Sequence, residues 1–217
     1  MNIAIDGPAG AGKSTIAKLV AKKLGYIYVD TGAMYRSIAL YMIENGISQD
    51  DDTNIASACN KISIRIAYED DTQHVYLNNE DVSVKIRMEK VGNMASVFAA
   101  KKAVRDKLLS LQRDIAAQND CIMDGRDIGT HVLPNAELKI YLTASVDTRA
   151  MRRYKELVEK GQDANLEQIK EDIKQRDYQD MNREIAPLKQ AEDAVLLDSS
   201  NMTIDEVVAA ICEKVIG

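Results

Sequence analysis

The sequence predicts an α/β fold in which helices cover both faces of a parallel β-sheet. One observation is that short, apolar, strand-like runs alternate along the chain with longer segments of helical periodicity. Another is that the first of these runs leads directly into residues 7–14, Gly-Pro-Ala-Gly-Ala-Gly-Lys-Ser. This is the G-x-x-x-x-G-K-[ST] pattern of a phosphate-binding loop, or P-loop, which joins a strand to a helix. Both observations therefore indicate the same architecture.

The elements of this sheet follow one another in order. Strands are expected at 3–5, 26–29, 121–123, 138–142 and 195–197. Helices are expected at 13–24, 31–45, 101–118, 146–160, 165–181 and 203–216. Ser145 or Asp147 can cap the helix that starts at 146, and Thr203 with Glu206 forms a capping box for the last helix. The acidic run 50–52 is interpreted as a solvated linker and the N-cap region of a helix.

Between residues 62 and 86 the periodicity changes from helical to alternating. Apolar residues at 62–68 alternate with polar ones, Asp70-Asp71 provides a turn, and residues 74–77 resemble a returning strand. A second turn at 78–81 and the run 82–86 add a possible third strand. The sequence therefore predicts a small antiparallel insertion that could cover one side of a substrate cleft.

Composition restricts the class of protein. The chain has 217 residues, of which 46% are hydrophobic and 29% charged, as in a globular protein with one main domain. No apolar run could cross a bilayer, and the start of the chain shows no leader pattern, so a cytoplasmic protein is expected. The net charge of −6 argues against a general nucleic-acid binder. Cys59, Cys121 and Cys212 are expected to be reduced, and His74 and His131 lack metal-ligand spacing and are interpreted as structural.

The P-loop predicts binding of a nucleoside triphosphate. Gly7, Gly10 and Gly12 allow the tight turns by which backbone N–H groups surround phosphates. Lys13 can reach the β- and γ-phosphates, and the Ser14 hydroxyl can bind Mg²⁺. The residues expected to contact the triphosphate are Gly7, Pro8, Ala9, Gly10, Ala11, Gly12, Lys13, Ser14 and Thr15.

A second polar segment, residues 124–130, follows the predicted strand 121–123. Ligands bind at the carboxyl ends of strands in such sheets. Asp124 can therefore reach the shell of the metal ion, through water, and Arg126 can hold the phosphate of an acceptor through its planar guanidinium. A salt-bridged turn without a binding role is the alternative.

Two further segments supply arginines that could face an anionic substrate. Arg36 lies early in the helix that follows the second strand, at the end of the run 30–36. Arg176, Asp180 and Arg183 are spaced i, i+4 and i+7, so they share one side of a helix and could bind a phosphate and a ribose. The alternative for Arg36 is an exposed helix arginine. The alternative for Arg176, Asp180 and Arg183 is an ion pair on the helix surface.

A basic cluster, Arg149, Arg152 and Arg153, precedes Gly161, where the helical pattern ends. A basic helical hairpin here could close over the polyphosphate as a lid. An exposed, solvated helix face accounts equally well for the spacing.

Taken together, these motifs make the chain resemble the bacterial cytidylate kinases over nearly its whole length. The segments that carry the resemblance are residues 5–13, 30–36, 92–96, 124–130, 176–177 and 182–183 with 186–188. The resemblance implies a nucleoside monophosphate kinase in a single P-loop domain, 1–217, with strand order 2-3-1-4-5. It also implies a monophosphate-binding insertion at 62–88, a lid at 150–164 and a monomer.

The resemblance also implies roles for individual arginines. Arg36, Arg126 and Arg183 would surround the phosphate of the acceptor. From the lid, Arg153 would act in catalysis and Arg152 would contact ATP. Both lid residues belong to the basic cluster described above.

For the nucleoside, the resemblance implies that Ser96, Arg105 and Asp127 meet the cytosine ring. Asp127 can accept a hydrogen bond from the N4 amino group, which uracil lacks. Arg176 and Asp180 would contact the ribose. These assignments predict a preference for CMP over UMP.

Thr31 and Ser14 depart from what the family often has. Thr31 stands where serine is common, so it keeps a hydroxyl for the sugar and adds a methyl group. Ser14 stands where glycine is common, which makes direct ligation of Mg²⁺ by its hydroxyl more plausible in this chain.

The function that the resemblance implies is transfer of a phosphoryl group from MgATP to CMP or dCMP in pyrimidine metabolism. Lys13, Arg126, Asp124 and Arg153 would be the catalytic residues. A nucleotide-dependent switch is the alternative from another class, but the sequence has neither N-K-x-D nor D-x-x-G. A kinase for another small acceptor is the closer alternative.

Overall fold

The computed structural model describes residues 1–69 and 72–216, which fall into two compact units. Unit 1 comprises Met1–Ile27 and Asp120–Gly217, and unit 2 comprises Tyr28–Asn119. The turn expected at Asp70-Asp71 lies outside the described residues. Within the described ranges, no helix combines the length and the apolar character needed to span a membrane.

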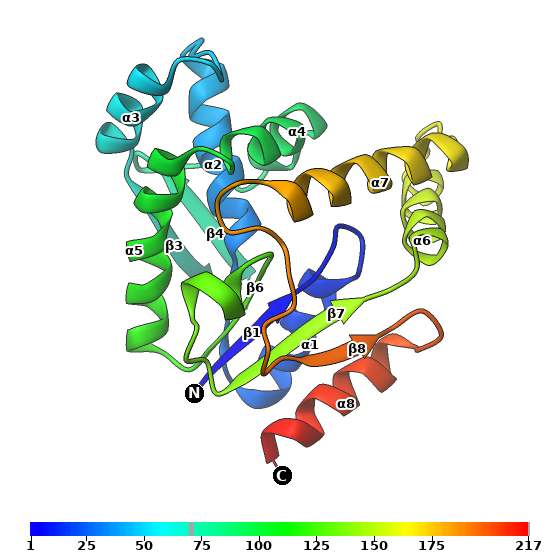
Figure 1. Cartoon of the computed structure of the whole chain (residues 1–217). Coiled ribbons are helices and arrows are strands. Elements are labelled where there is room, and N and C mark those ends of the chain that lie inside the picture. The colour runs from blue at the N-terminus through cyan, green and yellow to red at the C-terminus, as the bar shows by residue number, and fades with distance from the viewer. Residues whose placement is uncertain (70–71, 217) are drawn as a thin grey trace. The chain divides into compact units, whose positions relative to one another are not determined.

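Unit 1 contains the parallel sheet that the sequence predicts (Figure 1). Its strands are β1 (Asn2–Asp6), β6 (Cys121–Gly125), β7 (Leu138–Thr143) and β8 (Val195–Asp198), and β2 (Ile27–Asp30) leads into unit 2. The order is β2-β6-β1-β7-β8. The expected order, 2-3-1-4-5, counts only the strands of the parallel sheet. In the labels used here the antiparallel strands β3–β5 are counted too, so the third, fourth and fifth strands of the parallel sheet are β6, β7 and β8. Residues 3–5 of the central strand, β1, are buried on both faces, which explains why all three are apolar.

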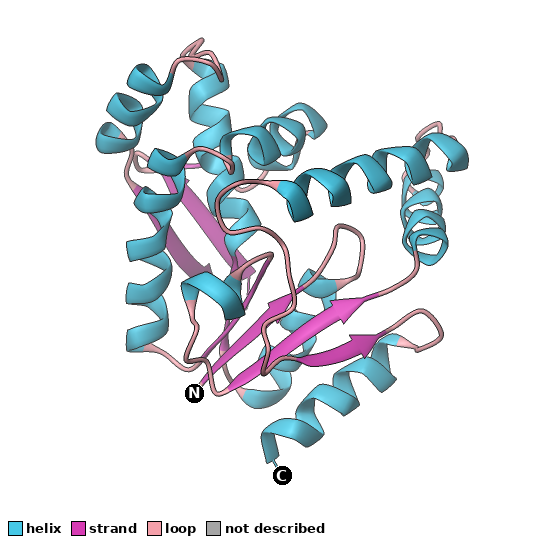
Figure 2. Ribbon diagram, in the orientation of Figure 1, coloured by secondary structure: helices cyan, strands magenta, loops and turns pink. Residues whose placement is uncertain are grey.

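The helices of unit 1 are α1 (Lys13–Leu24), α6 (Val146–Glu159), α7 (Leu166–Asn182) and α8 (Ile204–Ile216). Helices α1 and α8 pack against each other beside the sheet, and α6 and α7 form a hairpin (Figure 2). Ser145 caps α6 by accepting a hydrogen bond from the Thr148 N–H, and Thr203 and Glu206 form the predicted capping box. A short π-helix, Ile128–Val132, was not expected.

Unit 2 contains the predicted antiparallel insertion, a sheet ordered β3-β4-β5. Its strands are β3 (Ile64–Glu69), β4 (Thr72–Leu77) and β5 (Glu80–Asp81). Asn78 and Asn79, between β4 and β5, both have positive φ, as a two-residue type I′ hairpin turn requires.

The third strand expected at residues 82–86 is wrong. Strand β5 ends at Asp81, and a 3₁₀ helix, η1, forms at Lys85–Arg87. The reason is local hydrogen bonding, because Ser83 donates both its backbone N–H and its hydroxyl to the Asp81 carboxylate. This turn competes with continuation of the strand.

The helices of unit 2 are α2 (Thr31–Glu44), α3 (Asp52–Lys61), α4 (Glu89–Phe98) and α5 (Lys102–Gln118). Helix α4 was not expected, and α3 was expected only through its N-cap region at 50–52. The N-cap expected in the acidic run 50–52 is confirmed, because the Asp51 carboxylate accepts a hydrogen bond from the Asn54 N–H. Helix α4 buries Val91, Ala95 and Phe98, the i, i+4 and i+7 pattern of an amphipathic helix.

Candidate active site

The P-loop of unit 1 has the backbone that its glycines predict. Gly7, Gly10 and Gly12 have φ values of 149°, 76° and 88°, a region that other residues seldom adopt. A Cβ atom on Gly7 would in addition overlap the carbonyl oxygen of Leu142 on β7. The loop therefore turns tightly between β1 and α1, as phosphate binding by backbone N–H groups requires.

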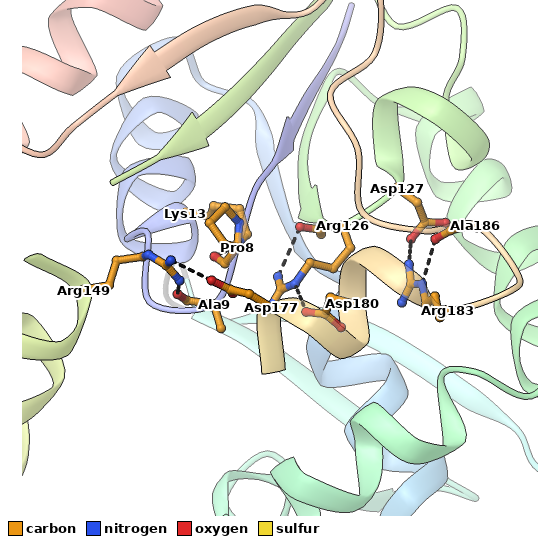
Figure 3. Close-up of polar contacts among 11 residues, drawn as sticks. Pro8, Ala9, Lys13, Arg126, Asp127, Arg149, Asp177, Asp180, Arg183 and Ala186 are labelled. Atoms are coloured by element: carbon orange, nitrogen blue, oxygen red, sulfur yellow. Dashed lines mark hydrogen bonds and ion pairs between the residues drawn. The ribbon is translucent and has the colours of Figure 1, made fainter. Parts of the chain in front are cut away.

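Lys13 is buried, and its ammonium donates a hydrogen bond to the Pro8 carbonyl at 2.7 Å (Figure 3). Burial, together with the nearby positive charge of Arg126, lowers the pKa of Lys13 from 10.5 to about 7. The carboxylates of Asp124 and Asp6 oppose this shift. An anionic phosphate beside Lys13 would restore its charged form.

We therefore expect ATP binding to take up protons at pH 8. With a pKa of about 7, most Lys13 amines are neutral at pH 8 before binding, and the phosphates raise that pKa when they bind. Calorimetric titrations in two buffers of different ionisation enthalpy measure the uptake. The Lys13→Arg variant, whose side chain stays charged, should show little uptake. Equal binding enthalpies for the wild type in both buffers would contradict the expectation.

Two oxygen donors predicted to serve a metal ion lie in contact beside the P-loop. The Ser14 hydroxyl donates a hydrogen bond to Asp124 Oδ2 at 2.9 Å, and Asp124 is 5% exposed at the end of β6. Within the described ranges, no cluster of three or more His, Cys, Asp or Glu residues could hold a metal ion. A hydroxyl and a carboxylate suit Mg²⁺, which commonly takes few protein ligands and completes its shell with water and phosphate oxygens.

Arg126 and Asp180, which are far apart in the sequence, form an ion pair in unit 1. Arg126 Nε donates to Asp180 Oδ2 at 2.8 Å, and Nη1 donates to the Gly125 carbonyl (Figure 3). Burial alone would lower the pKa of Arg126, but Asp180 and other carboxylates raise it overall. Burial would likewise raise the pKa of Asp180, but Arg126, Arg176 and Arg183 lower it overall. Both partners are therefore charged at neutral pH.

Arg183 pairs with Asp127, although the family resemblance assigns them to opposite ends of the acceptor. Arg183 Nη2 donates to Asp127 Oδ1 at 3.0 Å, and Arg183 Nε donates to the Ala186 carbonyl (Figure 3). Asp127 is 4% exposed. The predicted sharing of one helix side by Arg176, Asp180 and Arg183 is wrong for Arg183, because α7 ends at Asn182 and Arg183 follows it with an extended backbone. Arg176 and Arg183 nevertheless both lower the pKa of Asp180.

In the basic cluster of α6, Arg149 and Arg152 lie close to the P-loop, whereas Arg153 makes no polar contact with it among the described residues. Arg152 donates two hydrogen bonds to Ser199, and its Nη1 lies 4.0 Å from where a Cβ on Gly12 would be. Arg153, assigned to catalysis from the sequence, is 45% exposed and pairs with Glu156 on its own helix. It makes no hydrogen bond or ion pair to the P-loop in the part of the chain that the structure describes.

Arg149 on α6 hydrogen-bonds directly to the P-loop, although no individual role was expected for it from the sequence. Its guanidinium donates to the Ala9 carbonyl and pairs with Asp177 on α7 at 2.6 Å (Figure 3). It also donates to the Ala144 carbonyl. Arg153 lies one turn further along α6, about 6 Å beyond Arg149 at 1.5 Å per residue. The Ser145 cap could have identified Arg149 from the sequence. A helix that begins at 146 has Arg149 in its first turn, and therefore close to the sheet.

Asp6 is a second residue that sequence reasoning missed. It ends β1, is 5% exposed, and its two carboxylate oxygens accept hydrogen bonds from the N–H groups of Ile128 and Gly129 at 2.8 and 2.7 Å. Burial raises the pKa of Asp6 to about 6, although these two hydrogen bonds lower it. Asp6 therefore links residues 128–129 by hydrogen bonds to β1, the strand that leads into the P-loop.

The remaining predicted residues lie in unit 2. Thr31 is buried at the start of α2, and Ser96 is half-buried on α4. Arg105, on α5, is 4% exposed and its guanidinium lies 5.9 Å from the centre of the Tyr35 ring. Arg36 is not a simple exposed helix arginine, because its side chain is 28% exposed and pairs with Asp30 at 2.9 Å.

Comparison with known proteins gives a consistent result. A family model described as cytidylate kinase matches residues 3–216. The cytidylate kinase of Caldicellulosiruptor saccharolyticus is 53% identical, over 100% of this chain and 97% of that protein. The cytidylate kinase of Bacillus anthracis is 48% identical, over 100% of this chain and 96% of that protein. A solved shikimate kinase from Bacteroides thetaiotaomicron shares the fold, with a TM-score of 0.51, 13% identity, and coverage of 100% of this chain and 99% of that one.

Proposed function

The chain belongs to the cytidylate kinase family and is a phosphotransferase, and we propose that it transfers the γ-phosphoryl group of ATP to CMP and dCMP. The products are ADP and CDP or dCDP, in pyrimidine nucleotide metabolism. The observation that carries the proposal is the proximity of two cations, the buried Lys13 of the P-loop and the half-buried Arg126 that follows β6. Arg126 is close enough to lower the pKa of Lys13. Such a repulsive pair is well suited to receive phosphate groups between its members.

On the donor side, we assign the ATP phosphates to residues 7–15 and to Arg152. Ser14 and Asp124 would hold Mg²⁺, which would neutralise charge on the β- and γ-phosphates. Their contact at 2.9 Å beside the P-loop supports this assignment. Residues 150–164, which comprise most of α6 and the turn that follows it, would form the lid and would carry Arg153.

On the acceptor side, the assignments follow the chemistry of CMP. The guanidinium groups of Arg36, Arg126 and Arg183 would meet the phosphate. The proposed nucleoside contacts are Ser96, Arg105 and Asp127 for the base, and Thr31, Arg176 and Asp180 for the ribose. The insertion at 62–88 would complete this region. In the structure, each of these three arginines pairs with a carboxylate: Arg36 with Asp30, Arg126 with Asp180 and Arg183 with Asp127.

The chemical step is an in-line attack of a CMP phosphate oxygen on the γ-phosphorus of ATP. One P–O bond forms as the bond between the γ-phosphorus and the bridging oxygen breaks, and ADP leaves. CMP is already largely a dianion near neutral pH, so no strong general base is required. Lys13 and Arg126 act by holding the two nucleotides in line and by neutralising the charge of the transferring group.

The test is ADP release from MgATP with CMP, dCMP, UMP, AMP or no acceptor. We expect fast release with CMP and dCMP, and slow release in the other reactions. Equal slow release in every reaction would indicate a hydrolase or switch instead. Fast release with AMP alone would show a kinase for another acceptor.

The same assay tests base recognition with the Asp127→Asn variant. An amide can face the O4 of uracil without the repulsion that a carboxylate imposes, so the CMP/UMP ratio of kcat/KM should fall by about 10-fold. Circular dichroism shows whether the variant is folded, which matters because Asp127 also pairs with Arg183. An unchanged ratio in a folded variant counts against the contact with cytosine.

A further inference from the structure

Asp30 makes three polar contacts at the start of α2, all of them within unit 2. One carboxylate oxygen accepts a hydrogen bond from the Ala33 N–H at 2.9 Å and so caps the helix. The other accepts from Arg36 Nη2, also at 2.9 Å. The backbone N–H of Asp30 donates to Gln73 Oε1 on β4, which fixes the position of the cap residue itself. Helix capping explains the contact with the Ala33 N–H, but it does not explain the contacts with Arg36 and Gln73.

Gly32 provides the space for the contact between Asp30 and Arg36. A Cβ atom on Gly32 would lie 3.0 Å from Arg36 Nη1 and 3.1 Å from Asp30 Oδ1. Its φ is not positive, so the backbone would accept any side chain, and a helix disfavours glycine relative to alanine. Neither backbone conformation nor helix propensity therefore accounts for a glycine here, whereas the position of the guanidinium does.

The guanidinium held in this way keeps donors for another ligand. Asp30 engages Nη2, and Arg36 Nε is buried without a hydrogen-bond acceptor among residues 1–69 and 72–216. Buried donors normally have acceptors, so an acceptor from outside the chain is expected at this position. A phosphate oxygen satisfies that requirement and matches the charge of the guanidinium.

We propose that Asp30 and Gly32 are positioning residues that fix the Arg36 guanidinium for the phosphate of the acceptor nucleotide. The inference rests on the proposed function, in which Arg36 binds that phosphate. Asp30 holds one edge of the Arg36 guanidinium. Because glycine has no side chain, Gly32 lets that guanidinium lie close to the first turn of α2. Neither residue touches the substrate, and both act through Arg36.

The decisive variant is Gly32→Ala, because it separates positioning from stability. The added methyl group displaces the guanidinium by a few tenths of an ångström, and KM for CMP should rise about tenfold with little change in KM for ATP. The melting temperature should stay the same or rise, because alanine favours the helix. A structural role alone would instead lower the melting temperature and leave KM for CMP unchanged.

A second pair of variants separates the cap from the ion pair. Asp30→Asn keeps an oxygen for the cap but removes the charge that holds Arg36, so KM for CMP should rise with little loss of stability. Asp51→Asn is the matched control, because Asp51 caps α3 in the same way without an arginine partner among the residues that the structure describes. Its KM for CMP should not change.

A double-mutant cycle shows whether the effect passes through Arg36. In an Arg36→Ala background, adding Gly32→Ala should not raise KM for CMP further. An additional increase of the same size would overturn the proposal, as would an unchanged KM in Gly32→Ala itself.

A measurement without turnover distinguishes failure of this inference from failure of the proposed function. In the wild type, NMR of the Arg36 guanidinium should show slow rotation about its Cζ–Nη2 bond, and the rotation should be faster in Asp30→Asn. Equally fast rotation in both proteins would overturn the positioning. A wild type without CMP-dependent turnover would overturn the proposed function, while the NMR result would still decide whether Asp30 holds Arg36.

Discussion

The Lys13→Ala variant is expected to lose roughly a thousandfold in kcat while remaining folded. Lys13 places a buried ammonium in the P-loop, where charge on the transferring phosphoryl group must be stabilised without help from bulk water. The fold should survive, because burial already disfavours the charged ammonium and lowers its pKa to about 7. Steady-state kinetics with CMP and a thermal melt measure both parts of the expectation.

Lys23→Ala is the matched control for that experiment. Lys23 lies in the last turn of the same helix, α1, and is exposed. It should keep the kcat of the wild type. Near-normal turnover by a folded Lys13→Ala protein would remove Lys13 from catalysis and, with it, the proposed use of the P-loop.

The Arg126→Ala variant is expected to raise KM for CMP about 100-fold and to destabilise the protein. The first effect follows from loss of a guanidinium on the acceptor phosphate. The second follows because Asp180 would keep a buried charge without its principal partner, which costs about 3–5 kcal/mol. KM for ATP should change much less. Kinetics with each substrate varied in turn, and denaturant unfolding, measure these effects.

The double variant Arg126→Ala/Asp180→Asn separates the two effects. Removing the charge of Asp180 should restore most of the free energy of unfolding, because no unpaired carboxylate remains. It should not restore the affinity for CMP, since both side chains are assigned to the acceptor. Recovery of KM together with stability would show that Arg126 acts only through the ion pair.

The sequence predicted the middle of the sheet well because β1 and β6 carry the fully buried, apolar runs 3–5 and 121–123. Helix α4 was missed and α3 was expected only through its N-cap region, and both are short elements of unit 2. The third strand of the insertion was misplaced at 82–86 for a different reason. Its apolar residues fit a strand, but the bonds from Ser83 to Asp81 end the pairing, and such side-chain bonds are not part of a periodicity.

The site could be predicted where its residues are neighbours in sequence or share a helix. The P-loop is contiguous, so its chemistry follows from the motif. The contacts of Arg126 and Arg183 with carboxylates 54 and 56 residues away depend on the tertiary fold, and the sequence indicated the residues without indicating these pairs. The choice among the arginines of α6 likewise depends on which turn of the helix meets the P-loop, and a pattern of charges does not show this.

The two hydrogen bonds that Asp6 accepts restrict how this enzyme can be altered. One carboxylate at the end of β1 holds two consecutive amides of the 124–130 segment. Gly129 lies so close to the Lys139 side chain that a Cβ atom at position 129 would crowd it. Side chains of the segment can be exchanged on a fixed backbone, but an inserted or deleted residue would break the register with the P-loop strand. New acceptor specificities are therefore accessible by substitution in this segment rather than by changing its length.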